Sequence, residues 1–265
     1  MKKSIIAFIS LITLCIEPLM ASAEFSFKKY QVENGLSHNT TWCAIQDSYG
    51  FLWIGTSNGL NCYYGSGNKI YRNVLNDKYS LGNNFVSSLM EEGEDLWIGT
   101  SSGLYIYDRS DDHFLYFDKT TKYGVFISCE VKKIVKTKNG LIWIATLGQG
   151  IFIYDPAKDV LTQNSIRTFF AWDICQGTDS LVYVSSMQEG LLCFDEEGTF
   201  LQNYPVSSEL SIGNQRINCL HSIEHEIWCG VGTNSLGCYQ EGSQELKIYD
   251  TSAESFSSIL CLMDY

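Results

Sequence analysis

The stretch Leu52-Trp53-Ile54-Gly55-Thr56 decides the fold, because it returns along the chain in nearly the same form. It recurs as Leu96–Thr100 and, with small changes, as Ile142–Thr146, Leu181–Ser185 and Ile227–Val231. The aromatic residue at its centre recurs every 40 to 46 residues. The central aromatics are Trp53, Trp97, Trp143, Tyr183 and Trp228. In a chain with many aromatic and glycine residues, this period is typical of one four-stranded propeller blade.

Each copy lies in a unit with the same internal order. An apolar segment comes first, a turn follows, and the aromatic strand comes next. A short polar turn that ends in glycine then precedes a third strand of alternating apolar residues, as at Ser57–Gly59 and Ser101–Gly103. Glycine allows the positive φ that tight hairpins need. Together with a polar and aromatic fourth segment, each unit predicts four antiparallel strands.

The repeat predicts an all-β fold, a β-propeller with five recognisable blades and part of a sixth. The sixth blade is indicated by the apolar segment Phe256–Leu262 shortly before Tyr265, and Phe25–Tyr30 resembles a fourth strand with no unit before it. We therefore expect an incomplete or open propeller over residues 24–265, in a fragment of a longer protein. A β-sandwich is the alternative fold, but it does not predict a repeat of this period. A natural five-bladed protein is the alternative to a fragment.

Residues 1–23 form a separate segment. Lys2 and Lys3 precede the apolar run Ile5–Ile16, and Ala21–Ala23 matches an A-x-A cleavage signal. The run is about 12 residues long, too short to span a bilayer comfortably. We expect a signal peptide and an exported, periplasmic chain that begins near Glu24. A membrane anchor is the alternative.

The charge balance excludes two classes of partner. The chain has a formal net charge of −12. Such an acidic surface repels phosphate backbones and anionic lipids. We therefore expect neither nucleic acid nor a membrane surface as a partner of this segment.

The repeats resemble those of two-component regulator propellers. The resemblance rests on Asn34–Ser37, Gly50–Thr56, Asn58–Asn61 and Leu96–Thr100, and it weakens in the fourth and fifth units. Such propellers form the periplasmic sensor region of hybrid histidine kinases that regulate polysaccharide use. The resemblance implies a longer parent anchored in the inner membrane, whose kinase lies outside this chain. It leaves homodimerisation through that parent open.

A ligand site is expected where the repeat is broken, in the turns after each second strand and before each first strand. These turns are rich in Asn, Gln and Ser, which suits neutral hydroxylated ligands, and nearby aromatic rings can stack on a sugar. The candidate ligand-binding residues are His38, Asn39, Trp42, Asn58, Asn84, Phe85, Gln149, Gln188, Glu189 and Asn214. The alternative is that these loops are only solvated. The five central aromatics are expected to be structural, because they occur once per unit.

The cysteines leave two interpretations open. Cys229 and Cys238 are expected to face each other across the fifth hairpin, where they could form a disulfide. Several cysteines instead fall in positions that Ile or Leu fills in other units, as expected for buried free thiols. No CxxC pair exists, and His221 and His225 flank a predicted turn. We therefore expect no metal site and no cofactor.

The leading functional interpretation is a non-catalytic sensor that binds an oligosaccharide or another glycan-derived ligand. One alternative is a propeller enzyme acting on glycans, either a lyase or a glycosidase. A carboxylate pair with raised pKa on the loop face would favour the enzyme. The other alternative is a protein–protein interaction scaffold, which a large apolar patch without a pocket would favour.

Overall fold

The computed structural model describes residues 29–65, 67–164, 166, 168, 170–206 and 216–251. The described residues from Gln31 onward form one compact unit of five four-stranded antiparallel sheets with a short 3₁₀ helix, η1 (Val32–Asn34). The predicted signal peptide, the predicted strand at Phe256–Leu262 and most of Phe25–Tyr30 lie outside the described residues. Within the described ranges, no helix is long and apolar enough to cross a bilayer.

Each sheet is one blade, and its four strands are hydrogen-bonded in chain order. Blades 1 and 2 consist of β1 (Thr41–Gln46), β2 (Leu52–Thr56), β3 (Gly59–Tyr63), β4 (Asn68–Tyr71), β5 (Val86–Glu92), β6 (Asp95–Thr100), β7 (Gly103–Asp108) and β8 (His113–Tyr116). Blades 3, 4 and 5 consist of β9 (Glu130–Lys136), β10 (Ile142–Leu147), β11 (Gly150–Asp155), β12 (Val160–Gln163), β13 (Ala171–Gln176), β14 (Val182–Ser186), β15 (Gly190–Phe194), β16 (Phe200–Tyr204), β17 (Ile217–Ile223), β18 (Glu226–Val231), β19 (Ser235–Gln240) and β20 (Leu246–Asp250).

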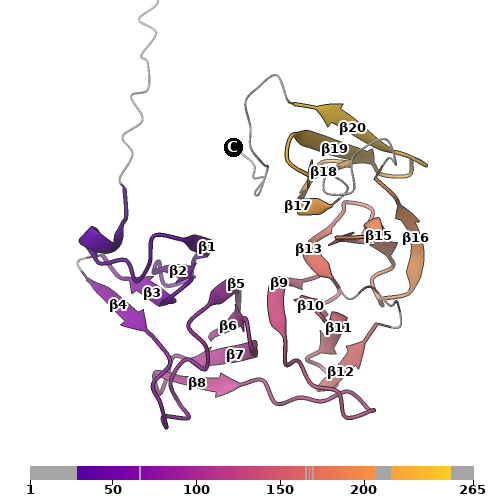
Figure 1. Cartoon of the computed structure of the whole chain (residues 1–265). Coiled ribbons are helices and arrows are strands. Elements are labelled where there is room, and N and C mark those ends of the chain that lie inside the picture. The colour runs from indigo at the N-terminus through magenta and orange to yellow at the C-terminus, as the bar shows by residue number, and fades with distance from the viewer. Residues whose placement is uncertain are drawn as a thin grey trace, which may run out of the picture. The chain divides into compact units, whose positions relative to one another are not determined.

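The first strands of consecutive blades are neighbours. β1 lies against β5, β5 against β9, β9 against β13, and β13 against β17. Figure 1 shows these strands on the inner side of the series of blades and the fourth strands on the outer side. Among the described residues, β1 and β17 stand at the two ends of the series and do not meet. The prediction of an all-β propeller with five four-stranded blades that do not close is confirmed.

The glycine of the repeated motif lets consecutive blades approach closely. A Cβ on Gly55 would stand 2.7 Å from a methyl carbon of Val86 in the next blade, and 2.5 Å from Sγ of Cys43. A Cβ on Gly99 would stand 2.8 Å from a methyl carbon of Val131 in the blade after that. Backbone that is approached this closely has no room for a larger side chain. The motif therefore carries glycine at this position because of a neighbouring blade.

The threonine of the motif closes the hairpin that follows it. Thr56 Oγ1 donates to the carbonyl of Gly59 at 2.9 Å and accepts the N–H of Asn58 at 3.0 Å. Thr100 does the same around Gly103. Gly59 has φ +126°, a conformation that only glycine adopts at little cost. Hydroxyl and glycine together specify the tight turn from the second strand to the third.

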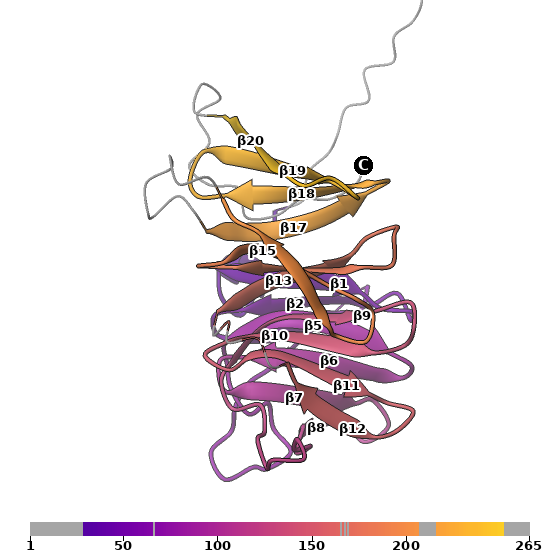
Figure 2. The same ribbon diagram turned by 90° about the vertical axis from the view of Figure 1, so that its right-hand side faces the viewer.

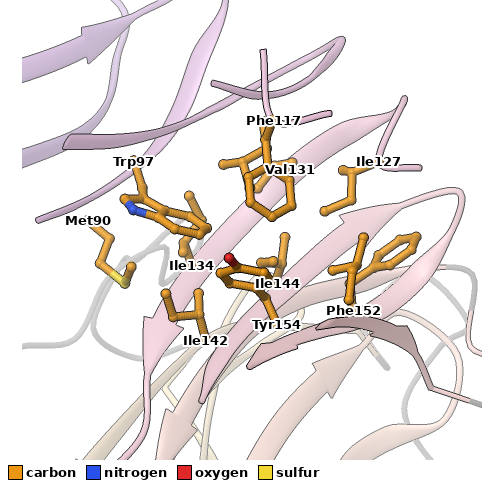
Figure 3. Packing of buried hydrophobic residues seen from close by; sticks show 12 residues of the cluster. Met90, Trp97, Phe117, Ile127, Val131, Ile134, Ile142, Ile144, Phe152 and Tyr154 are labelled. Atoms are coloured by element: carbon orange, nitrogen blue, oxygen red, sulfur yellow. The ribbon is translucent and has the colours of Figure 1, made fainter. Parts of the chain in front are cut away.

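The central aromatics of blades 1 to 4 pack between adjacent sheets. Each belongs to a hydrophobic cluster that includes residues of the next blade. Figure 3 shows Trp97 of blade 2 facing Val131 and Ile134 of β9, with Ile144 of β10 behind them. The core is therefore a series of layers between blades. Trp228 of blade 5 is only partly buried among the described residues, and it stacks on Tyr249 of its own blade.

The predicted pairing of Cys229 with Cys238 is not made. Both are free thiols, and the register of β18 with β19 places Cys229 opposite Gly237 and Cys238 opposite Trp228. Neighbouring register positions point to opposite faces of a sheet, so the two thiols diverge. Each is buried instead, as expected for cysteines that serve as small apolar side chains.

We expect Cys229 to resist alkylation by iodoacetamide in the native protein and to react fully once urea unfolds it. Burial raises the pKa of the Cys229 thiol well above its usual value, which suppresses the reactive thiolate. Quantitative mass spectrometry of the peptide that carries Cys229 measures this difference. A non-reducing digest that contains a disulfide-linked Cys229–Cys238 peptide would contradict the structure.

Candidate ligand-binding site

The blade topology gathers two kinds of turn at one end of the molecule. The turns from the second to the third strand and the connections between blades lie together, as the hydrogen bond from Gly59 N–H to the carbonyl of Asn84 shows. We call this the upper end, and we call the other, which carries the β1–β2 turn and its equivalents, the lower end. Figure 2 shows the strands running across the molecule between these two sets of turns.

The amide side chains that were predicted to bind a ligand form hydrogen bonds to the backbone of the upper-end loops. Asn39 Oδ1 accepts the N–H of Val32 at 2.9 Å, and Asn84 Oδ1 accepts the N–H of Asn73 at 2.7 Å. Gln149 bonds to both the N–H of Ser128, at 2.9 Å, and the carbonyl of Phe126, at 3.0 Å. These groups satisfy backbone atoms that the turns leave unpaired. Their amide oxygens are thus engaged within the protein.

Other predicted residues are held in similar ways. His38 Nδ1 accepts the N–H of Thr40 at 3.0 Å, and the carbonyl of Asn58 accepts from Arg72 at 3.0 Å. Glu189 accepts the Thr168 hydroxyl at 2.9 Å. Gln188 is exposed in the adjoining turn. Asn214 lies outside the described residues.

Two of the predicted residues, Trp42 and Phe85, come together as an aromatic pair from blades 1 and 2. Their ring centroids are 5.1 Å apart and the ring planes are inclined by 45°. Trp42 is 47% exposed, and its Nε1 donates to Ser57 Oγ at 2.9 Å. The hydrogen bond fixes the indole while leaving much of it open to solvent. This pair offers an apolar surface at the upper end.

Every first strand carries a β-bulge at an equivalent position. The pairing register of the first and second strands skips one residue near the upper end in blades 1, 2, 3 and 5, and two residues in blade 4. The first residues skipped are Trp42, Ser87, Lys132, Trp172 and Asn218. Bulges redirect side chains and are common beside functional sites. The residue at the bulge differs from blade to blade, whereas the motif on the second strand is nearly the same in every blade.

Three of the bulged residues meet although they come from different blades. The ammonium of Lys132 lies 4.1 Å from the ring centroid of Trp172 and 5.4 Å from that of Trp42. It also pairs with Glu130 at 3.1 Å, and the Lys132 side chain is only 8% exposed. A cation between two indole faces is stabilised electrostatically by both rings. We call Trp42, Phe85, Lys132 and Trp172 the inner aromatic site.

The side chains of the two other bulged residues hydrogen-bond to backbone carbonyls. Ser87 Oγ donates to the carbonyl of Val131 at 2.5 Å, and Asn218 Nδ2 donates to that of Gly232 at 2.7 Å. Beside the inner aromatic site, Lys133 pairs with Asp173 at 3.3 Å. Each lysine thus has its own carboxylate partner, and the two ion pairs carry no net charge. This balance suits a ligand without net charge.

Sequence reasoning found Trp42 and Phe85 but missed Lys132 and Trp172. The sequence does contain a sign of both residues. When the five units are aligned, Trp42, Lys132 and Trp172 stand at the same distance before the central aromatic. In the described ranges, no group of three His, Cys, Asp or Glu side chains is placed to hold a metal ion. His225, a member of the HxxxH pair, instead contacts the Thr178 hydroxyl at 2.8 Å.

These features define the class of the protein as a β-propeller built from sequence repeats. Residues 35–58 match the family model described as two component regulator propeller, so the chain carries a repeat of this family. The resemblance found in the sequence is thereby confirmed. The match begins in the Asn34–Ser37 segment and includes the first copy of the repeated motif.

Proteins similar to the chain include a histidine kinase and two solved propeller structures. Histidine kinase P4 from Formosa agariphila is 38% identical over 68 residues, which is 26% of this chain and 5% of that protein. The extracellular domain of a hybrid two component system from B. thetaiotaomicron superposes with a TM-score of 0.69 at 19% identity, covering 83% of this chain and 31% of that one. Virginiamycin B lyase from Staphylococcus aureus superposes with a TM-score of 0.61 at 14% identity, covering 79% of this chain and 69% of that one. At these identities, the two structural likenesses show the shared propeller fold alone.

Proposed function

We propose that the chain is the ligand-sensing propeller region of a hybrid two-component sensor and that it binds a glycan-derived ligand at the inner aromatic site. The observation that carries the proposal is the meeting of Trp42, Lys132 and Trp172 at bulged positions. Ring faces stack on the apolar faces of sugars, and Trp42 is 47% exposed and available for such stacking. The chain is exported to the periplasm, and the kinase lies in another part of the sensor.

The arrangement of carboxyl groups supports a binding role over an enzymatic one. Acid–base hydrolysis of a glycoside needs a carboxylic acid with a raised pKa at the ligand site. In the part of the chain that the structure describes, burial and the neighbouring Asp108 and Glu94 raise the pKa of Asp95. Asp95 begins β6 at the lower end, away from the inner aromatic site. The propeller lyase shares the fold, and its activity is the alternative outcome of the test.

We expect Trp42→Ala to weaken oligosaccharide binding about tenfold, because it removes one stacking face. The measurement is isothermal titration calorimetry of the purified chain with short neutral oligosaccharides derived from xylan, mannan, galactan and glucan. Lys132→Met keeps the side-chain stem and removes the ammonium, so we expect a smaller loss from looser placement of the two indoles. Tyr249→Ala on outer strand β20 removes a ring that is 49% exposed, and binding should not change.

The same incubations distinguish a sensor from an enzyme. New reducing ends or unsaturated products, abolished by a substitution in the inner aromatic site, would contradict the proposal in favour of a lyase or a glycosidase. Absence of binding across the panel would contradict the choice of a neutral glycan. Equal binding by the parent chain and Trp42→Ala would contradict the choice of site.

A further inference from the structure

Blade 1 carries a second group of exposed aromatic side chains at the lower end, opposite the inner aromatic site. Tyr49, Phe51 and Tyr64 are 58%, 38% and 46% exposed. The rings of Tyr49 and Phe51 are 6.5 Å apart and inclined by only 27°, while Tyr64 meets Phe51 edge-on at 6.3 Å. Two of the rings are thus nearly parallel, and the third stands edge-on to one of them. We call these three residues the lower aromatic platform.

The lower aromatic platform is held rigid from beneath. The buried carboxylate of Asp47 accepts the backbone N–H of Tyr49 at 3.0 Å and that of Phe51 at 2.8 Å. Arg109 of blade 2, bonded to Asp47 at 2.6 Å, lies 4.9 Å from the Tyr49 ring centroid. A site whose side chains are already ordered loses less entropy when a ligand binds. The turn is therefore built to present its rings before any ligand arrives.

The aromatic residues of the lower aromatic platform are not repeated in the other blades. The positions equivalent to Tyr49 hold glycine or polar residues in the other four blades: Gly93, Asn139, Asp179 and Glu224. The positions equivalent to Tyr64 hold Asp108, Asp155, Asp195 and Gln240. Residues that every blade needs for packing recur in every blade, whereas these occur once. Their exposure also argues against a packing role.

The size of the platform selects the kind of occupant. Three aromatic side chains exposed to this extent present on the order of 300 Å², whereas a stable protein interface covers about 800 Å² on each partner. The net charge of −12 also opposes association of two copies of the chain. A peptide strand would need free backbone donors, but those of Tyr49 and Phe51 are already bonded to Asp47. The platform therefore offers exposed aromatic rings over an area that a few sugar rings of a carbohydrate chain can cover.

We propose that the lower aromatic platform is a second carbohydrate-binding surface, which stacks successive sugar rings of a polysaccharide chain on Tyr49 and Phe51. It is separate from the inner aromatic site and does not depend on it. Pyranose rings present flat C–H faces to aromatic side chains, and Tyr64 closes one side. The surface would hold the chain on a polymer while the upper end binds a ligand.

The test is affinity electrophoresis of the full chain through native gels that contain arabinoxylan, mixed-linkage β-glucan, galactomannan or polygalacturonate. The Trp42→Ala background weakens binding at the inner aromatic site, so the retardation that is lost on further substitution of the platform reports on the platform. We expect that background to be retarded by at least one polymer. Adding Tyr49→Ala and Phe51→Ala should weaken the retardation about tenfold or more, since two stacking faces are lost.

Two control variants make the result specific. Tyr49→Phe keeps the ring and should keep binding, whereas Tyr123→Ala removes a tyrosine that is 81% exposed in the connection between β8 and β9 and should change nothing. The proposal is overturned if no polymer retards the Trp42→Ala chain, or if the added alanines leave retardation unchanged. Concentration-dependent self-association in sedimentation, abolished by the same alanines, would assign the platform to a protein interface instead.

Discussion

Trp143→Ala is expected to lower the free energy of unfolding by about 3–5 kcal/mol, the range for deletion of a large buried aromatic. Trp143 is fully buried, and it packs with Ile174 and Val184 of blade 4. Its ring meets that of Phe194 edge-on, with 5.6 Å between the centroids. Removing the indole leaves a cavity between two blades that the stiff sheets on either side cannot fill. Urea titration of the variant and the parent chain, followed by circular dichroism, measures the loss.

Two further variants test the reason for that loss. Trp143→Phe should cost much less, because the Nε1–H of Trp143 is buried without a hydrogen-bond partner in the described structure. Trp228→Ala should also cost less, although Trp228 fills the same position of the repeat, because it is only partly buried. If Trp228→Ala proved as damaging as Trp143→Ala, then burial between blades would not be the source of the stability.

Asp47→Ala is expected to lower the free energy of unfolding by about 3 kcal/mol, because the buried Nε1–H of Trp53 and the Arg109 guanidinium lose this carboxylate. The Asp47 side chain is fully buried between blades 1 and 2. Its Oδ2 accepts Trp53 Nε1 at 2.7 Å and Arg109 at 2.6 Å. Arg109 also holds Glu91 of β5 at 2.9 Å. The Asp47 carboxylate therefore links the β1–β2 turn by hydrogen bonds to the Trp53 indole of its own blade and to Arg109 of the next blade.

The contribution of Asp47 should depend on pH. Burial raises the pKa of this carboxyl, but hydrogen bonds from Trp53, Arg109 and the Phe51 N–H outweigh burial and bring the pKa below its usual 3.8. A carboxyl with a lowered pKa in the folded state stabilises fully above the unfolded value and loses that effect as pH falls through the folded value. The difference in unfolding midpoint between the parent chain and Asp47→Ala should thus be constant near neutral pH and shrink below 3.8.

Exposed Asp111 provides the matched control, since Asp111→Ala should leave the midpoint unchanged. A difference between the parent chain and Asp47→Ala that stays constant into strong acid would contradict the assigned charge of Asp47. A double substitution at Asp47 and Arg109 should cost less than the sum of the single substitutions, because the two groups act as a pair.

Most of the fold could be predicted from the sequence because it repeats. The spacing of Trp53, Trp97 and Trp143 indicated the blades, and Gly59 and Gly103 indicated the hairpins. The disulfide prediction failed because it needed the register of β18 with β19 to the single residue. One residue of register reverses the face of a side chain, and spacing along the chain does not define register that finely.

The candidate site was only half predictable for a related reason. Trp42 and Phe85 were found because they are aromatics at or just before a first strand, but the amides chosen with them serve the backbone. Lys132 and Trp172 lie within strands, and their role depends on bulges in pairs β9–β10 and β13–β14. A bulge is a property of the pairing between two strands, so neither strand shows it alone.

By itself, the sequence determined the four-stranded unit, its number of copies and the side chains that pack between copies. Hydrophobic period and turn chemistry are local, and repetition makes them unmistakable. Only the tertiary structure decided which non-repeated residues meet. The inner strands of separate blades bring Trp42, Lys132 and Trp172 together, and Asp47 orders a turn that presents Tyr49 and Phe51. Such contacts depend on how one blade is placed against another, which no single repeat encodes.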